Sequence, residues 1–261
     1  MQPDVLNPGG ALARYSAAEL KAIFREGWSQ QERVEGWVSS GLNSEFHDDH
    51  CREAWKSCLD RAVANVPDGP VLDVGTGPGT LSLMWAELGF ATTGIDFSPT
   101  MLEMARRLAE QRGLRVKFME GDAESLPFQE NQFTIVSSRF VLFTLPHPGY
   151  AIRRWAELLQ PGGALVIVGH EFAPGVEKPK PRENADTRIG WKISPEYRAA
   201  LDQLPFVDHQ QKHVQVVMEA AGLRDITALP VDDLIAARDH YSEGLETPRL
   251  HSTPYILVGR K

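Results

Sequence analysis

The feature that most constrains the fold is a regular alternation of short apolar runs and amphipathic segments along residues 70–169. A helix is predicted most clearly after Ser98, a favoured N-cap residue that precedes Pro99, a favoured first helical residue. Strands that alternate with helices across short connections form a parallel sheet with helices on both faces. We therefore predict an α/β fold with a doubly wound sheet. Its first five strands are expected at 70–74, 91–96, 115–119, 133–138 and 164–169, and the helices between them at 80–88, 99–113 and 150–159.

The segment before this sheet is predicted to be helical. Ser16 and Glu19 have the spacing of a capping box, which begins a short helix that Gly27 is expected to end. Apolar residues at helical spacing predict a second helix at 48–66 with one buried face. Between these two helices no pattern assigns a structure.

After the fifth strand we predict an insertion outside the sheet, followed by the last strands of the sheet. Residues 172–205 contain five prolines and are predicted to be an insertion that covers the substrate. The remaining residues are predicted to form helices at 209–221 and 232–242 and two closing strands, within 223–231 and 253–261. We therefore divide the chain into an N-terminal helical lid (1–66), a ligand-binding core (67–171), the insertion (172–205) and the C-terminal part of the core sheet (206–261).

Composition and charge narrow the function classes. The formal net charge is −8, with no run of basic residues, which disfavours a nucleic-acid partner because such binding depends on phosphate neutralisation. The first residues have neither a basic region nor an apolar run, and no apolar stretch approaches about 20 residues, so we expect neither a signal peptide nor a membrane span. Cys51 and Cys58 lie seven residues apart, roughly 10 Å along a helix, which is too far for a disulfide. We expect a cytoplasmic monomer or homodimer with both cysteines buried.

The stretch VLDVGTGPGT (71–80) places three glycines directly after the first strand. In a doubly wound sheet this loop is a ligand site, because glycines let backbone N–H groups approach an anionic ligand at a helix N-terminus. A dinucleotide site prefers G-x-G-x-x-G, but position 80 is Thr and Asp73 lies two residues before the first glycine. The spacing therefore disfavours an NAD(P)-dependent oxidoreductase, which stays as an alternative.

The form D-x-G-x-G-x-G resembles the first motif of class I S-adenosylmethionine (SAM)-dependent methyltransferases. Three further blocks, GIDFSPTML, GDAESLPF and VLFTLPHP…WAELLQPGGALVIV, are similar to that family in order and spacing. The resemblance covers about residues 68–170, and the two closing strands fit the family's terminal hairpin. It implies a seven-stranded sheet, mostly parallel with an antiparallel terminal strand. It also implies SAM as cofactor and S-adenosylhomocysteine as product.

The resemblance assigns roles to individual residues. The glycine loop would meet the methionine part of SAM, Asp96 would accept hydrogen bonds from both ribose hydroxyls, and Phe97 would pack against the adenine. Asp122 and Ala123 fall where the family reads the adenine amino group and ring nitrogen. The implied cofactor-binding residues are Asp73, Gly75, Thr76, Gly77, Gly79, Asp96, Phe97, Met101, Asp122, Ala123 and Ser138. An aromatic contact that the family makes from its N-terminus has three competing counterparts here, Trp28, Trp37 and Phe46.

The sequence identifies the catalytic residues less closely than the cofactor-binding residues. A SAM-dependent transfer needs a nucleophile held in line with the methyl group, and a general base where the nucleophile carries a proton. His170 and Glu171 follow the fifth strand and Arg139 ends the fourth, so these three are the candidates, with His147 as a further base. HDDH at 47–50 has the spacing of solvated polar residues at a helix cap rather than of metal ligands. No metal is expected.

We predict a SAM-dependent methyltransferase that acts on a small-molecule nucleophile, such as a secondary metabolite. The main alternative uses SAM without methyl transfer, by attack of the methionine amine on its own side chain, with release of methylthioadenosine. A non-catalytic SAM-binding module is also left open.

Overall fold

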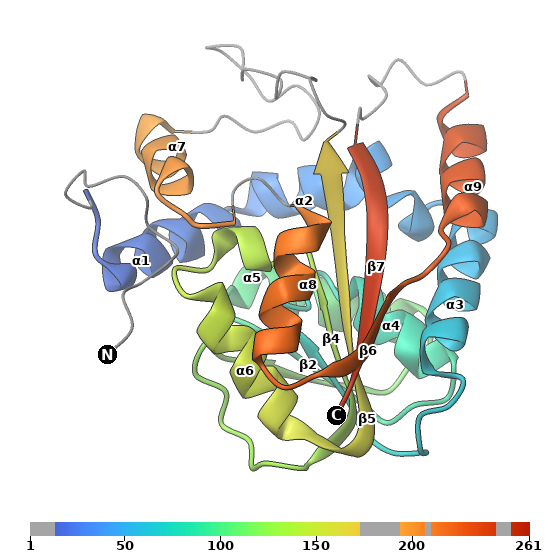
Figure 1. The fold of residues 1–261 in the computed structure, drawn as a ribbon. Coiled ribbons are helices and arrows are strands. Elements are labelled where there is room, and N and C mark those ends of the chain that lie inside the picture. Colours follow the sequence, from blue (N-terminus) through green and yellow to red (C-terminus); the bar gives the residue numbers. More distant parts are fainter. Residues whose placement is uncertain (1–13, 173–193, 207–209, 244–251) are drawn as a thin grey trace.

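The computed structural model describes residues 14–172, 194–206, 210–243 and 252–261. They contain a seven-stranded sheet in the order β3-β2-β1-β4-β5-β7-β6 (Figure 1). Strands β1 to β5 pair in parallel, and β7 is antiparallel to both β5 and β6, which confirms the predicted topology. The strands are β1 (Val71–Val74), β2 (Thr92–Asp96), β3 (Val116–Glu120), β4 (Phe133–Arg139), β5 (Leu159–Phe172), β6 (Arg224–Ala228) and β7 (Ser252–Arg260).

Helices cover both faces of this sheet, as predicted. One apolar core lies between the sheet and α6 and α8, and includes Trp155 and Met218. The other lies under α3, α4 and α9, and includes Trp85 and Leu234. Six helices predicted around the sheet are present: α3 (Asp49–Val63), α4 (Thr80–Glu87), α5 (Pro99–Gln111), α6 (Pro148–Leu158), α8 (Gln211–Ala220) and α9 (Asp232–Ser242).

Local capping explains where several helices begin. The Ser98 side chain accepts a hydrogen bond from the Met101 N–H, and Pro99 opens α5. The predicted capping box of Ser16 and Glu19 is present at the start of α1 (Ala17–Trp28). Gly27 was expected to end this helix, and α1 ends one residue later, at Trp28. A Cβ at Gly27 would lie 2.6 Å from the Arg33 guanidinium, so glycine permits this close approach.

Three elements had no sequence prediction. These are α2 (Gln31–Ser39), the 3₁₀ helix η1 (Gly41–Phe46) and α7 (Pro195–Asp202). Figure 1 shows α1, α2 and α7 at the end of the sheet toward which the β5 arrow points. Helix α7 lies in the predicted insertion and packs on α1, with the rings of Phe24 and Tyr197 in edge contact at 4.9 Å. The rest of the predicted insertion, residues 173–193, lies outside the described residues.

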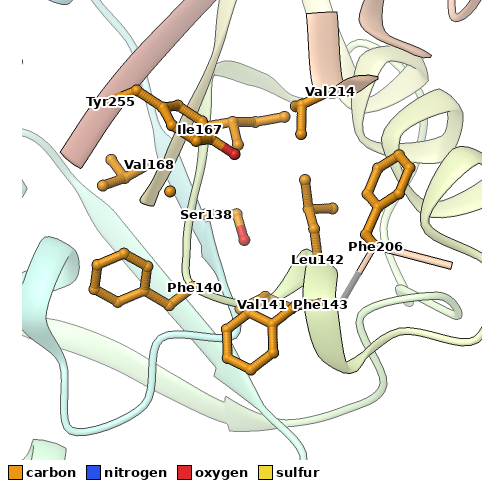
Figure 2. Close-up of a pocket in the computed structure, with 11 residues that line it drawn as sticks. Ser138, Phe140, Val141, Leu142, Phe143, Ile167, Val168, Phe206, Val214 and Tyr255 are labelled. Atoms are coloured by element: carbon orange, nitrogen blue, oxygen red, sulfur yellow. The ribbon is translucent and has the colours of Figure 1, made fainter. Parts of the chain in front are cut away.

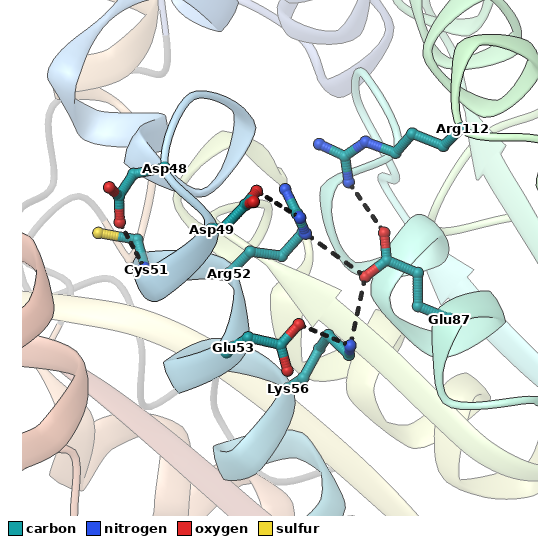
Figure 3. Close-up of polar contacts among 8 residues, drawn as sticks. All are labelled: Asp48, Asp49, Cys51, Arg52, Glu53, Lys56, Glu87 and Arg112. Carbon is teal, nitrogen blue, oxygen red and sulfur yellow. Dashed lines mark hydrogen bonds and ion pairs between the residues drawn. The ribbon is translucent and has the colours of Figure 1, made fainter.

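Ion pairs attach α3 to the core. Glu87 of α4 is approached by Arg112 at 3.2 Å, Arg52 at 3.7 Å and Lys56 at 3.8 Å (Figure 3). At the start of α3 the Asp48 side chain accepts a hydrogen bond from the Cys51 N–H. Both cysteines are free and buried on this helix, as predicted.

Candidate functional site

The glycine loop has the backbone geometry that its sequence requires. Gly75, Gly77 and Gly79 have φ values of 66°, 55° and 90°, in the region that only glycine adopts readily. A Cβ at Gly75 would lie 2.1 Å from the Val141 side chain, so glycine also permits this close approach. A Cβ at Gly77 would meet only the Met101 sulfur, at 4.0 Å. The loop is thus open above Gly77.

Asp73 supports this loop from inside the protein. Its carboxylate is buried and accepts hydrogen bonds from the side chains of Thr76 (2.7 Å), Ser82 (3.0 Å) and Ser137 (2.8 Å). Burial raises the pKa of Asp73, and these hydrogen bonds partly offset the effect. The structure therefore places Asp73 and Thr76 beneath the loop, where they fix its shape through contacts within the protein.

Asp96 ends β2 beside the open part of the loop. One carboxylate oxygen accepts a hydrogen bond from the Gly77 N–H at 2.8 Å, and the other accepts from the Ser98 N–H at 2.9 Å. Burial raises the pKa of Asp96 to about 6, despite these two backbone donors. The next residue, Phe97, packs against the apolar cluster that contains Phe24 of α1 and Tyr197 of α7.

Asp122 and Ala123 follow β3 at the same edge of the sheet. Asp122 accepts a hydrogen bond from the Glu124 N–H at 2.8 Å and forms an ion pair with Lys21 of α1 at 2.6 Å. Lys21 also contacts the buried Glu124, at 2.6 Å. The Ala123 carbonyl accepts from the Trp155 indole. Helix α1 is therefore joined directly to the loop that follows β3.

These residues fit SAM as a group. The space above Gly77 admits a ligand close to the backbone, and the Asp96 carboxylate beside it suits a vicinal diol because it has two acceptor oxygens. Phe97, directly after β2, supplies an aromatic surface, and Asp122, two residues after β3, supplies a carboxylate acceptor. The structure therefore brings most of the predicted cofactor residues to one edge of the sheet.

A second feature of this edge is an apolar pocket at the ends of β4, β5 and β7 (Figure 2). Val141, which packs on Gly75, forms part of its wall. Phe140 belongs to the wall as well, and has a φ of 60°, which is uncommon for a residue other than glycine. The predicted cofactor residue Ser138 lines the pocket and donates to the Val74 carbonyl at 2.9 Å. The other lining residues are Leu142, Phe143, Ile167, Val168, Gly169, Phe206, Val214 and Tyr255.

The three predicted catalytic residues lie near this pocket but are not among its lining residues. The Arg139 guanidinium forms a buried ion pair with Glu45 of η1 and lies 4.8 Å from the Phe140 ring centre. The His170 ring is in edge contact with Phe140 at 5.1 Å. Burial and the nearby Arg139 lower the pKa of His170 to about 4, so its imidazole is neutral at pH 7. Glu171 follows it on β5.

His147 and the HDDH segment have other contacts. The His147 imidazole lies 3.4 Å from Glu124, in the loop that follows β3. In HDDH, His47 contacts the Val38 carbonyl at 2.6 Å and Asp48 caps α3. The described part of the chain contains no group of three or more His, Cys, Asp or Glu residues placed to hold a metal ion.

Sequence reasoning missed most of the pocket, and Tyr255 above all. This residue comes from the last strand and pairs in register with Gly169 of β5. The only signal was its position in a strand expected to join the sheet, which does not indicate which neighbours it meets.

Comparisons with known proteins agree with this geometry. Residues 72–167 match the family model described as "Methyltransferase domain". A demethylmenaquinone methyltransferase from Thermus thermophilus is 40% identical over 121 residues, which are 46% of this chain and 54% of that protein. A ubiquinone/menaquinone biosynthesis C-methyltransferase from Burkholderia mallei is 27% identical over 222 residues, covering 79% of this chain and 85% of that protein.

A solved structure of phosphoethanolamine N-methyltransferase 2 from Haemonchus contortus, in complex with SAM, superposes with a TM-score of 0.57. It is 17% identical and covers 80% of this chain and 52% of that one, so the likeness concerns the fold. The chain spans about half the length of the first demethylmenaquinone methyltransferases that it matches. Among the described helices, none has the length and apolar character needed to span a membrane.

The glycine loop, the acid at the end of β2 and the strand order thus occur together with a matching domain model and named relatives. Residues 72–167 therefore form a methyltransferase domain, and the fold around it is similar to that of class I SAM-dependent methyltransferases.

Proposed function

We propose that this protein transfers the methyl group of SAM to a small-molecule acceptor bound in the apolar pocket. The observation that carries the proposal is the position of Val141, which packs on Gly75 of the glycine loop and also lines the pocket. A cofactor seated on the loop and a molecule in the pocket would therefore be neighbours. When bound, SAM supplies an electrophilic methyl group on a sulfonium.

The residues have separate tasks in this proposal. Asp96 holds the ribose, Phe97 and Asp122 hold the adenine, and the loop from Gly75 to Gly79 receives the methionine part. Helix α1 covers the site in this proposal, because Lys21 joins it to Asp122 and Glu124. The protein contributes mainly by orientation and by exclusion of water, which can supply a large part of the rate enhancement of a displacement reaction.

The relatives support a small acceptor. Two of them are named for menaquinone or ubiquinone biosynthesis, and the solved neighbour for phosphoethanolamine. We propose that the acceptor of this chain is a small molecule as well. The predicted candidates His170, Glu171 and Arg139 border the pocket region, and we propose them as residues that tune the electrostatics around the acceptor.

The proposal is tested by mass spectrometry of the full chain incubated with SAM, alone and with a small-molecule extract of the source cells. We expect S-adenosylhomocysteine only in the presence of extract, together with a product heavier by one methyl group. Release of methylthioadenosine from SAM alone would show attack on the aminopropyl arm and would overturn methyl transfer. Absence of both products, with SAM bound, would favour a binding module.

A further inference from the structure

The backbone turns sharply at Phe140, directly after β4. Its φ of 60° lies in the left-handed region, which is disfavoured about 5- to 30-fold for a residue that has a side chain. Among the described residues, Asn131 and Asp225 also have a positive φ without being glycine. Asparagine and aspartate tolerate this region because their short side chains form local hydrogen bonds, so the conformation is unusual only for Phe140.

This turn separates β4 from its neighbour β5. The two strands pair as far as Arg139 and Val168, whereas β5 continues to Phe172 alongside β7. An extended Phe140 would let the following residues pair with Gly169 and the rest of β5. Instead the Phe140 N–H donates to the Val168 carbonyl at 3.1 Å and the chain turns away, so that Gly169 lines the apolar pocket (Figure 2). The pocket thus occupies the place that a longer β4 would take.

The same turn places Val141 on the glycine loop. A Cβ at Gly75 would lie 2.1 Å from a Val141 methyl group, so the two residues are in close contact. The Val141 carbonyl accepts a hydrogen bond from the Thr144 N–H at 2.8 Å, in the short 3₁₀ helix η2 (Leu142–Thr144). Val141 lines the pocket as well. The backbone conformation of Phe140 therefore determines where the wall between the glycine loop and the pocket lies.

The Phe140 ring packs between two polar side chains. The Arg139 guanidinium lies 4.8 Å from the ring centre, and the His170 imidazole is in edge contact at 5.1 Å. Arg139 is itself fixed by its buried ion pair with Glu45 and by the Trp55 ring, 4.9 Å away. Two ring contacts of this kind are together strong enough to offset the unfavourable φ.

We propose that Phe140 is a positioning residue for methyl transfer: its ring contacts keep the backbone in the left-handed conformation, which places Val141 between the cofactor loop and the pocket. This inference rests on the proposed function for its effect on the reaction, whereas the hold on the turn can be measured without cofactor. In the proposed function SAM is held by Asp96 and Asp122. A looser turn therefore disturbs the alignment of the two reactants more than the binding of SAM.

Three variants separate the ring from the backbone. Phe140→Ala removes the ring and keeps the unfavourable φ, Phe140→Gly removes both, and Phe140→Tyr keeps the ring. Hydrogen–deuterium exchange of residues 141–145 in the full chain without cofactor reports on the turn, because the Thr144 N–H donates to the Val141 carbonyl. We expect exchange to be about tenfold faster in Phe140→Ala, to lose most of that increase in Phe140→Gly, and to be unchanged in Phe140→Tyr.

The reaction gives the second readout. Formation of S-adenosylhomocysteine is measured over a range of SAM concentrations, with a fixed amount of small-molecule extract of the source cells, at a temperature at which every variant is folded. We expect Phe140→Ala to lower the maximal rate at least about tenfold and to change the KM for SAM less than about threefold. The rate should recover partly in Phe140→Gly and fully in Phe140→Tyr. A merely structural role would leave the maximal rate of the folded variants unchanged.

Asn131 provides the matched control. It has a φ of 57°, is exposed, and lies before the start of β4, so it carries the same backbone change at a place away from the pocket. Asn131→Ala and Asn131→Gly should leave both the exchange of residues 141–145 and the maximal rate as in the wild type.

Unchanged exchange in Phe140→Ala, or faster exchange in Phe140→Gly than in Phe140→Ala, would overturn the inference. Faster exchange with an unchanged maximal rate would overturn it too, because the ring would then hold the turn without positioning the reactants. In each of these cases the proposed function stands if the wild type forms S-adenosylhomocysteine. If the wild type forms none in the presence of extract while Phe140→Ala loosens the turn, the hold on Val141 is supported and the methyl-transfer proposal fails.

Discussion

Replacing Asp96 with asparagine should separate cofactor binding from stability. The Asp96 carboxylate is 7% exposed, and its two oxygens accept from the Gly77 and Ser98 N–H groups while facing the proposed ribose position. Loss of the charge-assisted bonds to a ribose should weaken SAM binding by about 1.5–3 kcal/mol, or about 10- to 150-fold in Kd.

The same substitution should leave the free protein at least as stable. Burial raises the pKa of Asp96 from an ordinary 3.8 to about 6. Folding therefore favours the protonated form, and ionisation above pH 6 destabilises the fold by about 3 kcal/mol. In the wild type this group lowers the free energy of unfolding as pH rises from about 4 to about 6. Asparagine removes that penalty and gives up one backbone acceptor.

SAM affinity should change with pH in the direction opposite to stability, and rise as pH rises. Protonation of Asp96 removes an acceptor, so we expect SAM affinity to fall about tenfold between pH 7 and pH 5 in the wild type, and to change little in Asp96→Asn. Calorimetric titration of SAM measures affinity, and urea unfolding measures stability. Ser98→Ala is the control, since it removes the cap of α5 and costs about 1 kcal/mol of stability but keeps the carboxylate. Unchanged SAM affinity in Asp96→Asn would refute the assignment.

Three further substitutions test the neighbouring features. Both Gly77→Ala and Gly113→Ala place alanine at a positive φ, of 55° and 64°, so each should lower the free energy of unfolding by about 1–2 kcal/mol. Only Gly77→Ala should also weaken SAM binding, at least about tenfold, because Gly113 lies in an open turn. Glu45→Gln should destabilise the fold by about 3 kcal/mol in urea, because it leaves buried Arg139 without its carboxylate, and a Glu45→Gln/Arg139→Met double variant should recover much of the loss; strictly additive losses would disprove the coupling. Lys21→Met should speed amide exchange in α1 about fivefold and leave the central strands unchanged, and equal protection in both proteins would show that the ion pairs do not hold the lid.

The parts of the fold that could be predicted from sequence depend on local signals. Ser98 and Pro99 mark the start of α5 because their effects act within one helical turn. The glycine loop could be placed because positive φ values require glycine wherever the loop folds. Burial of Cys51 and Cys58 followed from helical spacing alone.

In the N-terminal segment, the start of α1 could be predicted because its capping box is local. Helix α2 could not be predicted because contacts with distant residues hold it. Helix α2 has few apolar residues of its own, and its Arg33 is held by Tyr197, 164 residues away. No local pattern contains such a pair.

The catalytic candidates show a similar limit. Sequence position placed Arg139 at the end of the fourth strand, which the structure confirms. His170 and Glu171 were expected after the fifth strand, but β5 is longer than predicted and contains both. Whether a side chain faces the pocket depends on its neighbours, and Arg139 turns to Glu45 of η1. Tyr255 was missed because it reaches the pocket through the pairing of β7 with Gly169 of β5, two strands that are distant in sequence.

A crystal structure of the full chain grown with S-adenosylhomocysteine tests the proposed site most directly. We expect both ribose hydroxyls within hydrogen-bond distance of Asp96, the adenine beside Phe97 and Asp122, and the sulfur near Val141 at the entrance to the apolar pocket. A ligand bound elsewhere, or a ribose that makes no contact with Asp96, would contradict the proposed arrangement.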